Sequence, residues 1–207
     1  MLAFELADRY RNPAVVLTDG FIGQMMEPLE LEPRVVEPPE KPWAVRGNAE
    51  TRANLITSIH LEPDALEAHV RKLEAKYRVA EEREARHELY LADDAEFLLV
   101  GYGIVSRVLR STVEQLREQG IRAGLFRPIS LWPFPSRALA AAAAKASAVL
   151  VVEMSTGQMV EDVRLALDGR VPVRFYSRVG GNVPQAEEVR DYLLHKVARP
   201  EFELAAS

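Results

Sequence analysis

The chain contains no cysteine, and this absence excludes several kinds of site. Disulfides, thiolate nucleophiles, zinc–thiolate centres and cysteine-ligated iron–sulfur clusters all need cysteine sulfur, so none can be built from this chain alone. The lack of disulfides fits a cytoplasmic protein, which is the location we expect. The sequence also lacks an uncharged apolar run of about 18 residues, so no membrane span is predicted.

Basic tracts and metal-ligand motifs are missing as well. The 31 acidic residues outnumber the 26 Lys and Arg, giving a net charge of −5, so no nucleic-acid partner is predicted. The four histidines are scattered without H-E-x-x-H spacing, and no metal site is predicted. Neither a Walker loop nor a G-x-S-x-G motif occurs. With 207 residues, 48% of them hydrophobic, the chain is long enough to bury a sizeable core.

The first part of the chain is predicted to form a small unit followed by an extended arm. Residues 2–11 have helical apolar spacing, and Asn12-Pro13 ends that helix because proline restricts the residue before it. Residues 14–17 are a short apolar run with two valines, which predicts a buried strand. Five prolines among acidic residues in 28–42 predict an extended linker.

A long charged helix is predicted over residues 63–91. Its apolar positions follow a 4-3-4-3 spacing that continues through His87 and Leu91. Three pairs of Glu and Arg stand at i,i+4 in the favourable order: Glu67–Arg71, Glu74–Arg78 and Glu82–Arg86. A narrow apolar stripe of this kind is typical of a solvated bridging helix or of a helix that contacts a partner.

A regular alternation of strands and helices follows. Strands are predicted over 96–100, 122–126, 148–152 and 171–176, with helices over 104–119, 136–146, 158–167 and 185–197. Strands that alternate with helices of 10–15 residues favour a mainly parallel sheet covered on both faces. The predicted fold class is therefore α/β, a three-layer α/β/α domain over about residues 95–200.

Four loops follow the carboxyl ends of these strands, where open α/β sheets bind ligands. The loop Gly101-Tyr-Gly103 favours a steric turn over a phosphate site, because Ser106 stands where a dinucleotide fingerprint has its third glycine. Glu153 is interpreted either as a helix cap or as a carboxylate that orients a ligand or subunit. Residues 127–135 are a packed corner or a docking surface, and residues 178–184 are a flexible glycine turn.

Five segments in this order, residues 4–28, 100–103, 126–135, 152–159 and 178–184, resemble the α subunit of 2-oxoacid:ferredoxin oxidoreductases, with a leaning toward the 2-oxoglutarate or branched-chain type. The resemblance implies a thiamine-diphosphate enzyme with Mg that decarboxylates a 2-oxoacid, forms acyl-CoA and reduces ferredoxin. It further implies that residues 1–30 are the tail of a pyrimidine-binding domain, 31–94 an arm with the long helix, and 95–200 a transketolase C-terminal-like domain.

The resemblance also implies what lies outside this chain. Most of the pyrimidine-binding domain is absent, and the family carries the Mg-diphosphate segment on its β subunit and the iron–sulfur clusters on other subunits. The chain alone is therefore expected to be catalytically silent, either a C-terminal piece of an α subunit or a split subunit. Its expected partners are the β subunit and the remaining α and γ parts, with ferredoxin and coenzyme A binding at the level of the complex.

The candidate site residues follow from the matched motifs, and none of them is predicted to be catalytic. Asp19, Gly20 and Gln24 are expected at the cofactor-side interface. A second group is expected to contact other subunits or to support the active site indirectly, with Glu153→Ala weakening assembly more than the fold; it consists of Arg127, Glu153, Gln158, Gly101 and Gly103. The alternatives are a free-standing nucleotide- or CoA-binding module and a scaffold that only joins other subunits.

Overall fold

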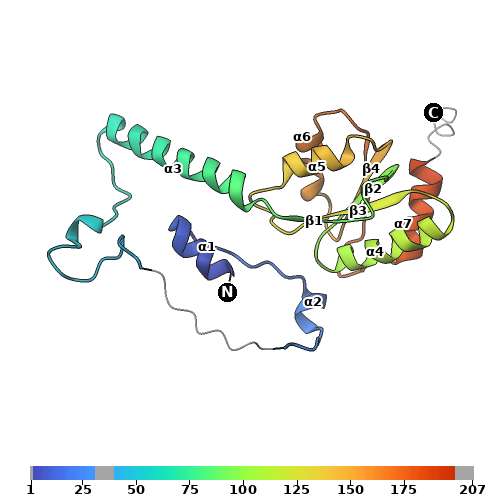
Figure 1. Ribbon diagram of the computed structural model, residues 1–207, viewed down its shortest axis with the longest axis horizontal. Helices are drawn as coiled ribbons and strands as arrows, with labels where there is room; N and C mark the ends of the chain where they lie inside the picture. The colour runs from blue at the N-terminus through green and yellow to red at the C-terminus, as the bar shows by residue number, and fades with distance from the viewer. Residues whose placement is uncertain (1, 31–39, 199–207) are drawn as a thin grey trace. The chain divides into compact units, whose positions relative to one another are not determined.

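The structure is a computed structural model that describes residues 2–30 and 40–198 (Figure 1). The chain divides into two units: residues 1–17 with 24–80, and residues 18–23 with 81–207. Most of the predicted proline arm, residues 31–39, lies outside the described residues. Six residues near the N-terminus therefore belong to the same unit as the C-terminal half of the chain.

The second unit contains a five-stranded sheet with the order β1-β3-β2-β4-β5. Strands β2 (Phe97–Val100), β3 (Ala123–Pro128), β4 (Ala148–Glu153) and β5 (Val173–Ser177) are parallel to one another. Strand β1 (His87–Tyr90) pairs antiparallel with β3 at one edge. Every residue of β2 and β4 is buried, which explains why both strands are apolar runs apart from Glu153, the last residue of β4.

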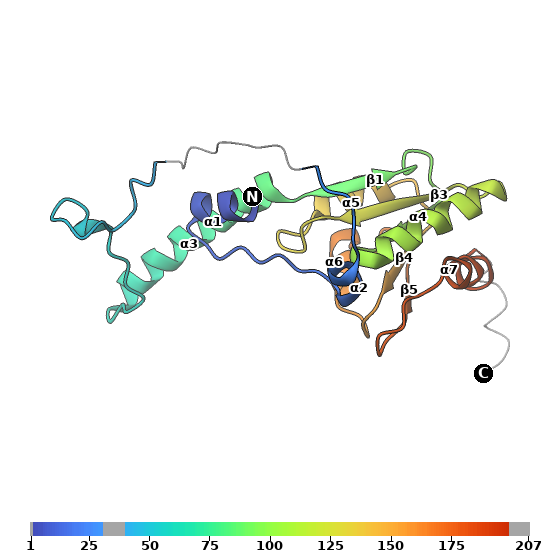
Figure 2. The ribbon, with the colours of Figure 1, turned by 90° about the horizontal axis from the view of Figure 1, so that it is seen from below.

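Helices cover both faces of this sheet (Figures 1 and 2). Helix α4 (Gly103–Glu118), helix α7 (Ala186–Tyr192) and the π-helical turn Leu193–Val197 pack on one face. Helices α5 (Ser136–Ala143) and α6 (Met159–Leu167) pack on the other. Side chains alternate along β2, so that Leu99 faces α4 and Leu98 faces α5 and α6. The predicted three-layer α/β/α fold with a mainly parallel sheet is confirmed.

The long charged helix is shorter than predicted. Helix α3 spans Pro63–Glu84, and residues 87–90, predicted to continue it, form β1 instead. The edge of β3 pairs with these residues in an antiparallel ladder, and His87 stacks on Phe126 with ring centroids 5.2 Å apart. These tertiary contacts override the local helical spacing. Among the described residues, no helix is both long enough and apolar enough to cross a membrane.

The predicted ion pairs along this helix are formed only where the helix persists. Arg71 lies 3.5 Å from Glu67, and Arg78 lies 2.7 Å from Glu74. Arg86 falls beyond the end of α3 and pairs with the buried Glu84 at 3.0 Å, so the predicted pair with Glu82 is wrong.

The first unit has almost no core of its own. It contains helix α1 (Leu2–Tyr10), the 3-10 turn Arg52–Asn54 and α3 up to Ala80, and Ala80 is the one buried residue among its described residues. The predicted buried strand over 14–17 is wrong: the segment forms no ladder, and Val16 is 77% exposed. A strand needs a neighbour to satisfy its backbone, and the described residues offer this segment none. The expectation that residues 1–30 belong to a pyrimidine-binding domain remains a prediction.

Candidate functional site at the carboxyl edge of the sheet

The carboxyl ends of β2 and β4 lie side by side, and a helix begins shortly after each of them. Val100 ends β2 and is followed by α4, while Glu153 ends β4 and is followed by α6. In parallel sheets this edge is the usual ligand side. Helix N-termini at such an edge are natural anion sites because their first N–H groups have no partner within the helix. In this chain, carboxylates accept hydrogen bonds from N–H groups at both helix starts.

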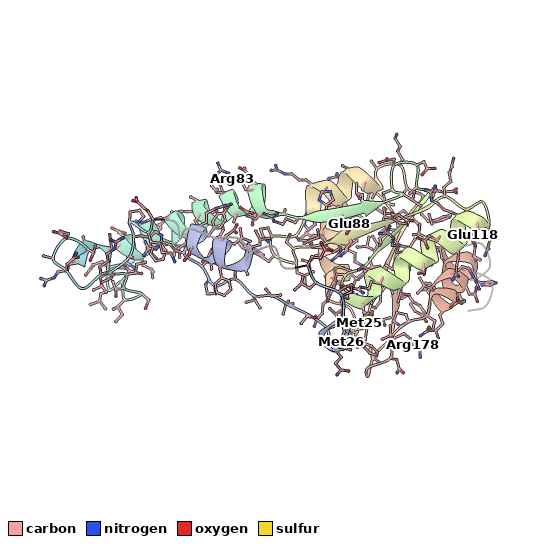
Figure 3. The ribbon with its side chains drawn as sticks, turned by 60° about the horizontal axis from the view of Figure 1, so that its bottom comes forward. Met25, Met26, Arg83, Glu88, Glu118 and Arg178 are labelled. Atoms are coloured by element: carbon pink, nitrogen blue, oxygen red, sulfur yellow. The ribbon has the colours of Figure 1, made fainter. Side chains whose placement is uncertain are left out.

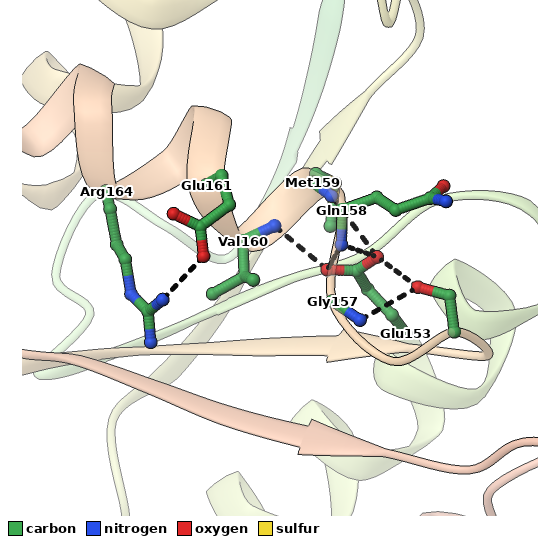
Figure 4. Close-up of polar contacts among 8 residues, drawn as sticks. Glu153, Gly157, Gln158, Met159, Val160, Glu161 and Arg164 are labelled. Carbon is green, nitrogen blue, oxygen red and sulfur yellow. Dashed lines mark hydrogen bonds and ion pairs between the residues drawn. The ribbon is translucent and has the colours of Figure 1, made fainter.

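Glu153 accepts hydrogen bonds from the free N–H groups at the start of α6 (Figure 4). Its side chain is 2% exposed, and its carboxylate accepts the backbone N–H groups of Val160 at 2.9 Å, Met159 at 3.2 Å and Gln158 at 3.1 Å. The hydroxyl of Ser155 donates a fourth hydrogen bond at 2.8 Å. A buried carboxylate with several N–H donors at a helix N-terminus is a strong cap, so the capping interpretation of Glu153 is the one that the geometry favours.

Asp19 accepts a hydrogen bond from a free N–H group at the start of α4. Helix α4 has no side-chain cap of its own and no acidic residue in its first turn. The Oδ2 atom of Asp19 accepts the backbone N–H of Ile104 at 2.8 Å. Its Oδ1 atom accepts the backbone N–H of Ile22 at 2.8 Å, which caps the short helix α2 (Gly20–Gln24). The sequence carries no signal that links Asp19 to a residue 85 positions later, and this relationship was not predicted.

The two glycines of the Gly101-Tyr-Gly103 loop are required for different structural reasons. A Cβ on Gly101 would lie 2.7 Å from the Cδ1 of Leu109 and 2.9 Å from the Cγ1 of Val105, under α4. Gly103 has a φ of +59°, and its Cβ would lie 2.5 Å from the Oδ2 of Asp19. Both glycines therefore serve the packing and capping of α4, in agreement with the steric interpretation of this loop.

The charges of the two caps act on neighbouring side chains. Burial, with the carboxylates of Glu153 and Asp19 as further causes, raises the pKa of the half-buried Tyr102 phenol. Burial also raises the pKa of Asp162 on α6, with the charges of Glu153 and Glu161 adding to the effect. This edge of the sheet is consequently acidic in character.

Arg127 does not lie in the strand-end loop where the sequence placed it. Strand β3 continues to Pro128, and Arg127 is directly opposite Glu88 of β1 in the antiparallel register. Its guanidinium Nη1 lies 2.8 Å from the Glu88 carboxylate, which Figure 3 shows on β1. Both side chains are 44% exposed, so this cross-strand ion pair contributes little to stability.

The remaining predicted site residues are exposed and make no contact with the two caps through their side chains. Gly20 and Gln24 are the first and last residues of α2, and both are exposed. Gln158 contributes its backbone N–H to Glu153, whereas its side chain points away from the carboxylate (Figure 4). The structure thus brings Asp19 together with Gly103, and Glu153 together with Gln158. The cofactor-side role of Gly20 and Gln24 stays a prediction.

The described residues do not fit a magnesium diphosphate group. The helix termini that would receive its phosphates already hold the carboxylates of Asp19 and Glu153, whose negative charge repels a phosphate. In the part of the chain that the structure describes, no group of three or more His, Asp or Glu side chains is arranged to hold a metal ion. The fold and site define a three-layer α/β/α domain in which carboxylates of the chain itself occupy the N-termini of α4 and α6.

Comparison with known proteins supports this description and supplies the family. Residues 95–189 match the family "Pyruvate:ferredoxin oxidoreductase core domain II". The chain is 52% identical over 190 residues to the ketoisovalerate oxidoreductase subunit VorB of Methanothermobacter thermautotrophicus, covering 91% of this chain and 54% of VorB. It is 31% identical over 219 aligned positions to the 2-oxoglutarate synthase subunit KorA of the same organism, covering 93% of this chain and 58% of KorA. The chain is thus a relative of 2-oxoacid:ferredoxin oxidoreductase subunits, which confirms the resemblance read from its motifs.

A solved structure supports the fold. The 2-oxoglutarate:ferredoxin oxidoreductase from Magnetococcus marinus, with 2-oxoglutarate, coenzyme A and succinyl-CoA bound, matches 65% of this chain and 24% of its own chain with a TM-score of 0.59 and 21% identity. At this identity the match speaks for the fold alone. The chain spans only about half the length of the curated relatives it matches.

Proposed function

We propose that this chain supplies the C-terminal part of the α-type subunit of a branched-chain 2-oxoacid:ferredoxin oxidoreductase. The observation that carries the proposal is a gradient of identity to three subunits of one organism, Methanothermobacter thermautotrophicus. Identity is 52% to the ketoisovalerate oxidoreductase subunit VorB, 31% to the 2-oxoglutarate synthase subunit KorA and 26% to the pyruvate synthase subunit PorA. The assembled enzyme would convert a branched-chain 2-oxoacid and coenzyme A into acyl-CoA and CO₂, passing two electrons to ferredoxin.

The chemistry of this reaction belongs to companion chains. The absence of cysteine supports iron–sulfur clusters that lie outside this chain, and the carboxylates at the N-termini of α4 and α6 speak against a diphosphate group bound at these two helices. The chain alone would therefore be catalytically silent, and its folded α/β domain would contribute structure to the complex. The same occupied termini speak against a free-standing module that binds nucleotides or coenzyme A by their phosphates.

The first unit supplies the reason to expect companions. Its described residues include only one buried side chain, while Phe4, Val15, Val16 and Leu17 are each more than 70% exposed. Apolar surface of this extent is costly in water. The relatives carry nearly as much additional polypeptide as is present here, and we propose that an equivalent polypeptide covers these side chains. Gly20 and Gln24 would contact the same polypeptide, with the β subunit, coenzyme A and ferredoxin completing the complex.

The test is reconstitution of the complex. The chain would be co-expressed with the companion subunits encoded beside it, and reduction of a low-potential dye would be measured with thiamine diphosphate, Mg and coenzyme A. We expect 3-methyl-2-oxobutanoate to support the highest kcat/KM, ahead of 2-oxoglutarate and pyruvate, and no activity without the companions. A preference for 2-oxoglutarate or pyruvate would overturn the substrate class, and turnover by the chain alone would overturn the proposal.

An assembly variant makes the role of the first unit testable by itself. Val16→Asp places a charge within the exposed apolar segment, so it should abolish co-purification of the companions while leaving the melting temperature of the chain unchanged. Val16→Ile is the matched control and should co-purify normally. Normal co-purification of the Val16→Asp chain would show that this segment is not covered.

A further inference from the structure

We infer that Asp19 is a positioning residue, which fastens residues 18–23 to the start of α4 and so fixes where the N-terminal polypeptide joins the α/β domain. We call this arrangement the Asp19 clasp, defined as the carboxylate of Asp19 with the backbone N–H groups of Ile22 and Ile104. The inference concerns contacts within the second unit, and it stands whether or not the proposed enzyme activity is found.

The clasp uses both carboxylate oxygens at once. Oδ1 caps α2 through Ile22, three residues on, and Oδ2 caps α4 through Ile104, each at 2.8 Å. One negative charge thereby lies at two helix N-termini, where the partial positive charges of the helix dipoles favour it. Helix α2 has only five residues, far too few to be stable by itself, so its position depends on contacts of this kind.

The start of α4 has free N–H groups and space for a carboxylate from elsewhere in the chain. Tyr102, the residue before α4, is extended and makes no side-chain cap, so the first N–H groups of the helix stay available. Gly103 leaves the space that the Oδ2 of Asp19 occupies, because any side chain there would bring its Cβ to 2.5 Å from that oxygen. The positive φ of Gly103 and the lack of a local cap on α4 thus leave room for the carboxylate of Asp19, which lies 85 residues before Ile104 in the sequence.

The Asp19 clasp lies in a short segment that belongs to a different unit from its neighbours in the sequence. Residues 18–23 belong to the second unit, whereas the residues on either side of them belong to the first. Among the described residues 18–23, Asp19 makes the one side-chain hydrogen bond to the rest of the second unit, the bond that it accepts from the Ile104 N–H.

Amide hydrogen exchange on the full chain tests the clasp directly. In the native chain the Ile22 and Ile104 amides should be protected, and Asp19→Ala should speed the exchange of both by about tenfold or more. Asp19→Asn keeps one acceptor oxygen, so it should preserve the protection of one of the two amides. The amide of Leu99 in β2 should be unaffected in every variant, and the exposed Asp93→Asn is the matched control. Unchanged protection of Ile104 in Asp19→Ala would overturn the inference.

A double-mutant cycle provides a second, independent readout. Gly103→Ala imposes backbone strain in any background, but its clash with the carboxylate exists only when Asp19 is present. Its lowering of the urea midpoint should therefore be clearly larger in the native background than in Asp19→Ala. Equal losses in the two backgrounds would show that the space at Gly103 is not reserved for Asp19, and would refute the clasp.

Discussion

The carboxylate of Glu153 accepts the backbone N–H of Val160 at 2.9 Å, across the turn that joins β4 to α6. Because Glu153 is almost fully buried and accepts further bonds from the same turn, its oxygens are used inside the domain. We therefore expect Glu153 to be required for the stability of the domain itself, while its role in assembly stays a prediction.

Replacement of Glu153 by alanine should lower the free energy of unfolding by about 2–4 kcal/mol, because three buried or half-buried N–H groups lose their acceptor. Urea denaturation of the full chain measures the loss. Glu161→Ala, which removes an exposed carboxylate 2.7 Å from Arg164 on the same helix, is the control and should cost under about 1 kcal/mol. If Glu153→Ala matched the control in stability but failed to assemble with companions, Glu153 would act mainly in assembly.

Gly101→Ala should destabilise the domain by about 1–3 kcal/mol, since the added methyl group meets Leu109 and Val105 beneath α4. Thermal and urea unfolding report the effect. Gly20→Ala is the matched glycine control, because its Cβ would meet nothing within 4 Å, and it should be neutral or slightly stabilising. Equal stability of the two variants would argue that α4 moves away from the sheet at no cost.

The parts of the fold that were predicted correctly are those encoded locally. The residues of β2, and those of β4 before Glu153, are apolar because helices cover both faces, and such runs can be recognised without knowledge of their neighbours. Residues 87–90 were assigned to a helix because their strand conformation depends on the edge of β3, some 40 residues later. Likewise, residues 14–17 have the composition of a strand, but the described chain provides no neighbouring strand.

The same division applies to the site. The capping interpretation of Glu153 could be weighed from sequence because the acid, the turn and the helix are contiguous. The pairing of Asp19 with Ile104 could not, since nothing local marks a helix that lacks its own cap as the receiver of a distant carboxylate. Arg127 was misplaced for a related reason: its partner Glu88 belongs to β1, the strand that the helical spacing had concealed.

Arg117→Ala should lower the free energy of unfolding by about 2–3 kcal/mol. The Arg117 guanidinium donates to the backbone carbonyls of Ala123 and Leu91, both at 2.7 Å, and so ties the end of α4 to the sheet. Arg122→Ala, whose exposed side chain lies 3.7 Å from Glu96, is the control and should cost under about 1 kcal/mol. Similar losses in the two variants would mean that water replaces Arg117 at these carbonyls.

Asp94 forms an ion pair with Arg117, and this pair should make the free energy of unfolding depend on pH. A hydrogen bond from Arg117 and its positive charge hold the pKa of Asp94 below its ordinary value of 3.8. A carboxyl group whose pKa is lowered by folding contributes stability that is present above its unfolded pKa and is lost as the pH falls through its folded pKa.

The stability difference between the native chain and Asp94→Asn should therefore be constant above about pH 5 and shrink as the pH falls below about 4. Urea midpoints measured at intervals from about pH 2 to about pH 7 follow the change. In the Arg117→Ala background the difference should be small at every pH, because the cause of the lowered pKa has been removed. A difference that stayed the same at low pH would mean that Asp94 acts through hydrogen bonds that do not require its charge, and the ion pair with Arg117 would then contribute nothing to the fold.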